Sequence, residues 1–295
     1  MSVSVAAPAK VNLSLRVLGK RDDGFHEIRT VFQAVDLADE VRIEWSARDV
    51  SLRVEGADVG PEAENLAYRA AMAFLDASGE ARGVRIHLVK HIPAGAGLGG
   101  GSSDAAAVLR CLAAMSPSPP PKEELHRIGA ALGSDVPFFL GSSPLAMAEG
   151  RGERLTALPP LPEAHVVLVM PPVHVSTAEA YRALGRERVT AEDSRPRAVA
   201  PQDDAPRSWH DISFALHNDF EAPVASRHTE VARSLSALRG AGASGALLSG
   251  SGAAAFGIFG GAEEAARVAS ILERDLGWRC TSVRTLTSMP ELVAS

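Results

Sequence analysis

The chain has 295 residues, 46% of them hydrophobic and 22% charged, so it is long enough to bury one large or two medium hydrophobic cores. Its 30 Lys and Arg residues stand against 36 Asp and Glu, and the formal net charge of -6 argues against a main role in binding nucleic acid or membrane phosphates. Two cysteines, Cys111 and Cys280, exclude a disulfide framework, and no apolar run is long enough to cross a membrane, so we expect a cytoplasmic protein.

The first predicted elements make a β-rich region. Residues 11–17 alternate apolar and polar side chains, which predicts a half-buried strand. The pair Asp23-Gly24 favours a tight turn, and a return strand is expected over 28–35. Further strands are expected over 40–45, 50–54 and 84–89, and a helix over 65–77.

Helices follow the glycine-rich stretch 95–101. Residues 102–115 predict an alanine-rich helix, which 116–121 ends because its prolines cannot continue a helix. A short amphipathic helix is expected over 122–132, and residues 133–139 begin a new element.

The second half alternates strands and helices. A domain boundary is expected in the Gly-, Pro- and charge-rich residues 150–160, and residues 186–211, dense in charge and proline, predict a solvated excursion. We therefore expect an α/β (α+β) chain with two domains, 1–155 and 156–295. The expected elements are a buried strand over 164–170, a helix over 222–238, a Gly-rich turn at 249–252, a strand over 254–259, a helix over 263–276 and a strand over 279–286.

The strongest local signal is the glycine-rich stretch that begins at Pro93. Its glycines let backbone N–H groups face a ligand, and the N-terminal end of the following helix favours an anion. The stretch is therefore predicted to hold phosphate, although a glycine-rich turn that serves only tight packing is the structural alternative. The residues concerned are Pro93, Ala94, Gly95, Ala96, Gly97, Leu98, Gly99, Gly100, Gly101, Ser102 and Ser103.

Two other nucleotide motifs fit this stretch less well. It is no Walker A loop, since neither Lys-Ser nor Lys-Thr follows the last glycine. The spacing Gly95-x-Gly97-x-x-Gly100 matches a dinucleotide fingerprint, with acidic residues about 20 positions beyond it. The proline-rich residues 116–121 cannot form the central strand that this fingerprint requires, but a nicotinamide-binding oxidoreductase stays an alternative.

Several motifs together resemble the GHMP small-molecule kinases. The three superfamily motifs lie at 7–13, 93–106 and 248–256. Residues 23–26 and 133–138, in this order and at these separations, are similar to one branch of the family, whose members phosphorylate a polyol linked to cytidine diphosphate in the non-mevalonate pathway of isoprenoid synthesis. The resemblance implies two domains, an N-terminal one like ribosomal protein S5 and a ferredoxin-like C-terminal one.

The resemblance implies that Lys10 and Asp135 are catalytic. Phosphoryl transfer to an alcohol needs an acceptor for the hydroxyl proton and positive charge near the developing negative charge, and these two residues supply them. Without the resemblance, the structural alternatives are a helix N-cap for Asp135 and an exposed lysine on a strand for Lys10. ATP is implied as co-substrate with Mg²⁺, which Ser102 or Ser103 could approach; no cluster with metal-ligand spacing names a protein ligand.

The resemblance also implies an acceptor pocket. A cytosine ring is expected between the side chains of Phe25 and Tyr181, with His26 bonding the edge of the base. Core packing for Phe25 and a plain surface role for His26 are the alternatives. Further matched positions are Asn12 and Thr177 near the polyol or diphosphate, Gly250 in a loop that closes over the acceptor, and Asn65, an N-cap or an adenine neighbour.

Two other functions stay open on the same motifs. One is a GHMP kinase for another alcohol, such as mevalonate or a sugar, and the other is a non-catalytic nucleotide sensor. In every case the expected partners are small molecules, with no nucleic acid and no membrane, and the chain is expected to be a monomer or a weak homodimer.

Overall fold

The computed structural model describes residues 2–188, 208–209, 212 and 215–294. The elements of the first half are β1 (Ser2–Lys20), β2 (His26–Ser46), β3 (Ser51–Glu55), η1 (Glu62–Glu64), α1 (Leu66–Ser78), β4 (Gly83–Val89), α2 (Gly100–Met115), α3 (Lys122–Leu132), α4 (Val136–Leu140), β5 (Leu145–Gly150) and β6 (Arg154–Ala157). Those of the second half are β7 (His165–Met170), α5 (Thr177–Arg188), β8 (His217–Asn218), α7 (Glu221–Ala225), α8 (Thr229–Gly240), β9 (Gly245–Leu248), β10 (Ala255–Phe259), α9 (Ala262–Leu276), β11 (Arg279–Arg284) and β12 (Val293–Ala294).

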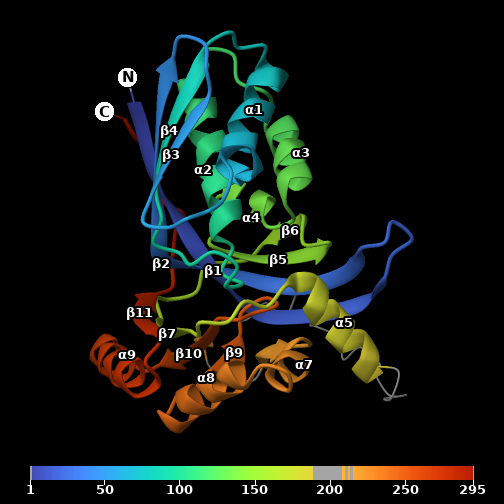
Figure 1. Ribbon diagram of the computed structural model, residues 1–295, viewed down its shortest axis with the longest axis vertical. Coiled ribbons are helices and arrows are strands. Elements are labelled where there is room, and N and C mark those ends of the chain that lie inside the picture. Colours follow the sequence, from blue (N-terminus) through green and yellow to red (C-terminus); the bar gives the residue numbers. More distant parts are fainter. Residues whose placement is uncertain (1, 189–207, 210–211, 213–214, 295) are drawn as a thin grey trace.

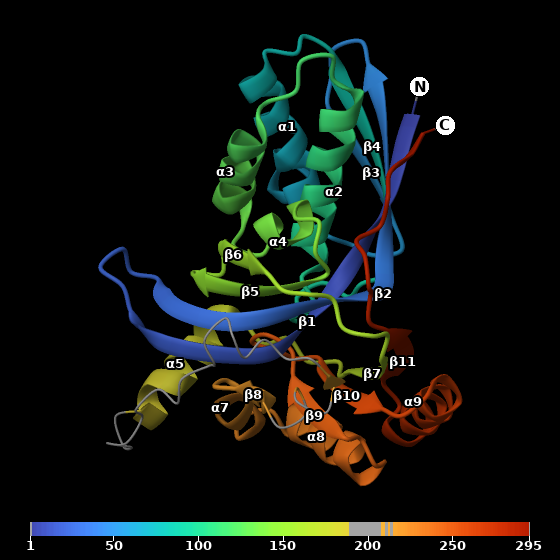
Figure 2. The ribbon, with the colours of Figure 1, turned by 180° about the vertical axis from the view of Figure 1, so that it is seen from behind.

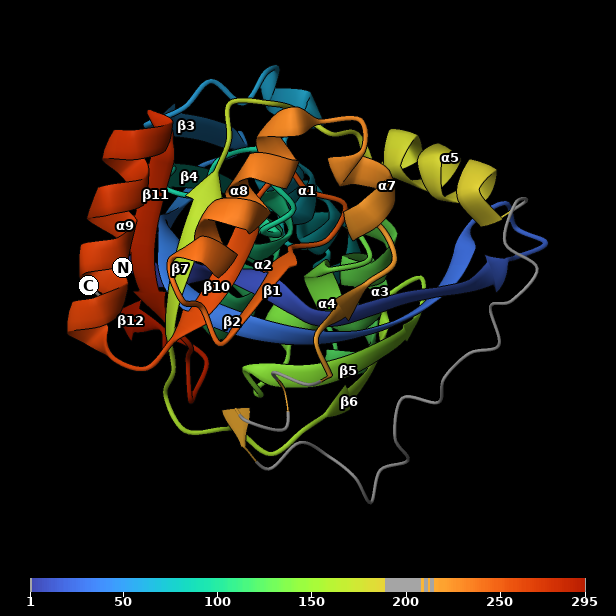
Figure 3. The ribbon, with the colours of Figure 1, turned by 90° about the horizontal axis from the view of Figure 1, so that it is seen from below.

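These elements build two sheets that each carry helices on one side, which confirms the predicted α+β class. The first sheet has the order β12-β1-β2-β4-β3, with β5 and β8 attached to it, and the second has the order β11-β7-β10-β9. Helices α1 to α4 lie with the first sheet in the upper half of Figure 1, and α8 and α9 lie with the second sheet in the lower half. Figure 3 shows α8 and α9 on the outer face of that second sheet.

The predicted hairpin forms, but its return strand is longer than expected. Residues 28–35 and 40–45 belong to one strand, β2, which pairs with β1 from Ser2↔Glu44 to Lys20↔His26, so the expectation of two separate strands was wrong. Residues 36–39, which begin and end with an aspartate, look in the sequence like a break between two strands. In the structure a register shift between Pro8 and Ala9 absorbs this irregularity without ending the ladder.

Strand β1 is buried on both faces rather than on one. Its apolar face meets the second sheet, where Val11 and Leu13 join Leu168 and Phe256 in a shared core. The polar side chain of Asn12, expected to face solvent, is buried as well. The alternating pattern therefore predicted the strand correctly. The prediction that one face of the strand is exposed was wrong, because a polar network covers that face.

One further expectation was wrong, and several elements were not expected. The helix expected over 222–238 is two helices, α7 and α8, since the chain is extended at His228 and the Ser226 hydroxyl donates to the Pro223 carbonyl oxygen. Strands β5, β6 and β9 were not expected, and β6 crosses the predicted boundary at 155/156. The excursion 186–211 lies mostly outside the described residues.

The C-terminal segment returns from the second sheet to the first. The backbone N–H of Leu286 donates to the Ala34 carbonyl, and β12 pairs with the start of β1, so the two chain ends lie side by side in Figure 2. Both cysteines are free and buried, as expected. No helix within the described residues combines the length and apolar character that a membrane crossing requires.

Candidate active site

Lys10 projects from the middle of β1 into the space where the two glycine-rich stretches meet. Its ammonium donates to Asn12 Oδ1 at 2.7 Å and to the Gly97 carbonyl at 2.9 Å. Burial lowers the pKa of Lys10, and the nearby charge of Asp135 opposes this shift. Asn12 in turn donates to Thr30 Oγ1 on β2, so β2 positions the amide that accepts from the ammonium.

The two glycine-rich stretches contact each other directly. A Cβ atom on Gly97, whose φ is +79°, would lie 2.3 Å from the Ser249 carbonyl oxygen, a distance that only glycine permits. The Ser249 hydroxyl donates to the Gly97 carbonyl, and a Cβ on Gly250 would lie 3.4 Å from Lys10 Nζ. Residues from both ends of the chain therefore enclose one lysine.

Asp135 lies at the start of the short helix α4 and faces the same lysine. Its Oδ2 atom is 3.6 Å from Lys10 Nζ, and its side chain is 30% exposed while that of Lys10 is 4% exposed. No hydrogen bond of its side chain caps the helix. Asp135 therefore occupies the N-cap position, but its side chain makes no capping hydrogen bond, which leaves the carboxylate available to a ligand.

The acceptor-side residues predicted from the resemblance line one cavity of about 650 Å³. Its walls come from the β1–β2 hairpin, the turn before α4, helix α5 and the Gly250 turn. The predicted residues that line it are Lys10, Asn12, Phe25, His26, Asp135, Thr177, Tyr181 and Gly250.

The aromatic side chains of this cavity are arranged differently from the expected sandwich. Tyr181 stacks on His26 with ring centroids 4.1 Å apart, and Phe220 meets Tyr181 edge-on. The Tyr181 face against His26 is therefore closed to a base. Phe25 is more than half exposed, and the guanidinium of Arg151 lies 4.8 Å from the centroid of its ring. Burial raises the pKa of Tyr181 to about 12, so its hydroxyl stays protonated at neutral pH.

A second cavity of about 360 Å³ lies along the glycine-rich stretch and shares Gly97 and Gly99 with the first. Every predicted nucleotide residue lines it except Ser103, which is buried with its hydroxyl unpartnered within the described structure. Asn65 lines it and also caps α1, because its Oδ1 accepts from the Ala67 N–H. The two alternatives for Asn65 are therefore compatible.

A buried ionic cluster beneath this stretch was missed from the sequence. Lys90, at the end of β4, donates to Asp39 on β2 and to Asp104 in α2. Asp39 also accepts from the backbone N–H groups of His91 and Ile92. Burial of the cluster raises the pKa of Asp104 to about 7 despite the neighbouring Lys90. No sequence spacing relates these three residues, since they meet only when the sheet and α2 pack together.

Comparisons with known proteins agree with this geometry. Residues 65–142 match the family model described as "GHMP kinases N terminal domain", and residues 202–277 match "GHMP kinases C terminal". A 4-diphosphocytidyl-2-C-methyl-D-erythritol kinase of Geobacter sp. is 44% identical, with 96% of this chain and 99% of the relative covered. A protein of the same name from Deinococcus radiodurans is 40% identical, with 94% and 91% covered.

Solved structures give the same result. A crystal structure of 4-(cytidine 5'-diphospho)-2C-methyl-D-erythritol kinase superposes with a TM-score of 0.76 at 39% identity and covers 96% of this chain and 98% of its own. Homoserine kinase from Cytophaga hutchinsonii, at 18% identity and a TM-score of 0.66, shares the fold, with 99% and 97% covered. The chain is thus a small-molecule kinase that belongs to the GHMP kinases, in their 4-diphosphocytidyl-2-C-methyl-D-erythritol kinase family.

Proposed function

We propose that this enzyme transfers the γ-phosphoryl group of ATP to the 2-hydroxyl of 4-diphosphocytidyl-2-C-methyl-D-erythritol, in the non-mevalonate route to isoprenoid precursors. The observation that carries the proposal is the pair formed by the buried Lys10 and the partly exposed Asp135, which lies where the phosphate-loop cavity and the acceptor cavity share Gly97 and Gly99. A phosphoryl donor and an alcohol held in these two cavities would meet at that pair.

The chemistry requires little from the side chains. The acceptor hydroxyl oxygen attacks the γ-phosphorus while the bond to the oxygen bridging the β- and γ-phosphorus breaks, and ADP leaves. Asp135 accepts the hydroxyl proton, because its carboxylate is accessible and makes no cap bond. The ammonium of Lys10, held by Asn12 and the Gly97 carbonyl, stabilises charge on the phosphoryl oxygens.

The acceptor is proposed to lie with its cytosine against the face of Phe25 that Arg151 leaves open and within reach of His26. This position differs from a simple Phe25–Tyr181 sandwich, since one face of Tyr181 is already covered by His26. Gly250 and Ser251 close the pocket from the second glycine-rich turn, and the Ser251 hydroxyl lies 3.1 Å from that of Thr177 at the start of α5. The division of the chain into domains 1–155 and 156–295 likewise stays a proposal.

Mg²⁺ fits this site only as an ion carried by ATP. No group of three or more His, Cys, Asp or Glu side chains that could cage a metal occurs in the described ranges. Mg²⁺ retains water and phosphate oxygens as most of its ligands, so few protein oxygens are needed. Ser102, which lines the nucleotide cavity, would supply one, and the ion would neutralise charge on the phosphates.

The test is a direct assay with the purified chain, ATP and Mg²⁺. Incubation with 4-diphosphocytidyl-2-C-methyl-D-erythritol is expected to yield ADP and one new phosphomonoester, detected by ³¹P NMR and mass spectrometry. Parallel incubations with mevalonate, homoserine and galactose are expected to yield none above background. Phosphorylation of one of these alcohols in place of the cytidylyl substrate would overturn the proposal, as would ATP binding without any turnover.

A further inference from the structure

The turn between β5 and β6 lies next to the proposed catalytic base. A Cβ atom added to Gly152 would lie 3.9 Å from Asp135 Oδ1 and 3.7 Å from Ser134 Cβ. The turn is also held internally, because the Gly152 N–H donates to the Glu149 carbonyl and the Arg151 N–H donates to the Glu153 carboxylate. The backbone from which the Arg151 side chain departs is therefore fixed beside the site.

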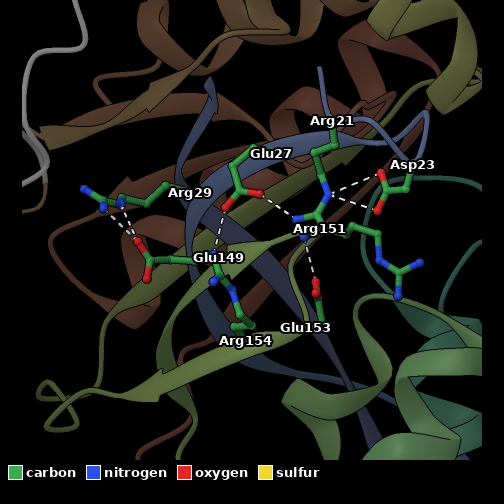
Figure 4. Close-up of polar contacts among 8 residues, drawn as sticks. All are labelled: Arg21, Asp23, Glu27, Arg29, Glu149, Arg151, Glu153 and Arg154. Atoms are coloured by element: carbon green, nitrogen blue, oxygen red, sulfur yellow. Dashed lines mark hydrogen bonds and ion pairs between the residues drawn. The ribbon is translucent and has the colours of Figure 1, made fainter. Parts of the chain in front are cut away.

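Arg151 differs from the arginines of the adjacent β1–β2 hairpin and of β6, which are paired with carboxylates. Arg21 pairs with Asp23 and Glu27, Arg154 pairs with Glu27, and Arg29 pairs with Glu149. Figure 4 shows these pairs, and it shows the Arg151 guanidinium with no contact to any of the drawn carboxylates. Within the described residues no ion pair to Arg151 is formed, although Asp23 lies close enough for the Arg151 charge to help lower its pKa.

The guanidinium points into the acceptor cavity instead. It lies over the face of Phe25 and lines the cavity, which also holds Lys10 and Asp135. Cationic side chains outnumber acidic ones among the residues of this wall: Lys10, Lys20, Arg151 and Arg182 stand against Asp135. A cavity with this balance favours a ligand with several negative charges.

We propose that Arg151 is a binding residue for the diphosphate of the acceptor. This inference rests on the proposed function, which supplies a diphosphate on the cytidine side of the reacting alcohol. A guanidinium donates two parallel hydrogen bonds to phosphate oxygens, and Arg151 has all its side-chain donors uncommitted within the described structure. The pairing of its neighbours leaves Arg151 as the arginine of this turn that is available to the substrate.

The experiment compares ligands with and without the diphosphate. Binding of cytidine and of CDP is measured by calorimetry for the wild type, Arg151→Ala and Arg151→Lys, with the nucleotide cavity saturated by a non-hydrolysable ATP analogue. The wild type is expected to prefer CDP over cytidine, and Arg151→Ala to lose about 10- to 100-fold of that preference. The preference of Arg151→Lys for CDP is expected to lie between those of the wild type and Arg151→Ala, since lysine keeps the positive charge but cannot donate two parallel hydrogen bonds.

Arg154→Ala is the matched control, because Arg154 begins β6 directly after this turn but is paired with Glu27 and does not line the cavity. This variant is expected to keep the wild-type preference. In turnover assays Arg151→Ala is expected to raise the KM for the cytidylyl acceptor by a similar factor and to leave the KM for ATP unchanged.

The possible failures are distinguishable. A wild-type chain that binds neither CDP nor cytidine and does not phosphorylate the acceptor would overturn the proposed function. If the wild type prefers CDP and turns over the acceptor, but Arg151→Ala keeps the same preference and the same KM, the role of Arg151 is wrong and the proposed function stands.

Discussion

At the residue scale, Lys10 shows how one side chain depends on its own strand and on two distant segments. Its ammonium is hydrogen-bonded by Asn12 from the same strand and by Gly97 from the phosphate loop, and it faces Asp135 from the turn before α4. Burial works against a charged ammonium, as the lowered pKa of Lys10 shows, so these partners are needed to keep the charge in place. The charge is thereby held at a fixed position before substrate arrives.

Removal of either member of this pair is expected to abolish most turnover. Asp135→Asn removes the proton acceptor and is expected to lower kcat by about 100- to 10,000-fold, and Lys10→Ala removes the charge and is expected to lower it by about 100- to 1000-fold. Calorimetric ATP binding is expected to stay close to that of the wild type in Asp135→Asn. Lys122→Ala, on the exposed start of α3, is the control; near-normal kcat in both active-site variants would contradict the assignment.

At the element scale, the active site is a junction of loops held by sheet and helix. The glycine-rich stretch runs from β4 to α2, and the cluster of Asp39, Lys90 and Asp104 joins β2, β4 and α2 just beneath it. On the other side the stretch packs against the second glycine-rich turn through Gly97 and Ser249. The loop is therefore fixed from both sides although it has no regular structure of its own.

Gly97→Ala tests the contact between the two glycine-rich stretches. Alanine at φ +79° with its Cβ directed at the Ser249 carbonyl is expected to reduce the free energy of unfolding by about 1–3 kcal/mol. It is also expected to lower kcat, since the Gly97 carbonyl holds Lys10. Denaturant unfolding and steady-state assays measure both effects.

Gly185→Ala is the matched control for this substitution. Gly185 lies in α5 with no atom within 4 Å of an added Cβ, so the change is expected to be neutral or to stabilise by up to about 1 kcal/mol. Equal effects of the two substitutions would show that the loop contact is unimportant.

The ionic cluster predicts a particular pH dependence of stability. Because the pKa of Asp104 is raised from 3.8 to about 7, the folded protein keeps a proton that the unfolded chain releases between these values. The stabilisation from this proton is fully present below about pH 4 and is lost as pH rises through about 7. Relative to Asp104→Asn, which cannot titrate, the wild type is expected to lose up to about 1.4 kcal/mol per pH unit across this window.

Urea unfolding of both proteins at pH 5, 6, 7 and 8 measures this difference. The same series with Asp76→Asn, an exposed position on α1, controls for the loss of one carboxylate. A wild-type minus Asp104→Asn difference that stays constant with pH, or that matches the Asp76 control, would refute the role of the buried proton.

At the scale of the whole molecule, β1 and the C-terminal segment hold the two sheets together. One face of β1 packs with β7 and β10, and the polar residues of its other face form the site. After β11 the chain returns to the first sheet, where Met289 joins its core and the Pro290 carbonyl accepts from Arg110 on α2. The relative position of the two glycine-rich stretches depends on these contacts.

Met289→Ala tests the importance of this return segment. The side chain is 8% exposed within the first core, so its truncation is expected to cost about 2–3 kcal/mol of unfolding free energy. Glu291→Ala, exposed two residues later, is expected to change stability by less than about 0.5 kcal/mol. Thermal and denaturant unfolding compare the two, and an equal, small effect would show that the segment is only loosely attached.

Local patterns predicted most of the elements correctly, including the hairpin turn at Asp23-Gly24, the helix 122–132 and the buried strand at 164–170. They failed where the deciding contact is distant. The continuity of β2 past a register shift and the burial of both faces of β1 depend on residues far along the chain.

The sequence by itself determined the phosphate-binding stretch, the family and the residue types that carry the chemistry, because glycine spacing and side-chain identity are local properties. Only the tertiary structure decided that Lys10, Asp135 and Gly250 surround one point, that His26 occupies a face of Tyr181, and that Arg151 alone in its turn lacks a carboxylate among the described residues. Proximity, burial and charge pairing are properties of packed elements, and no spacing along the chain encodes them.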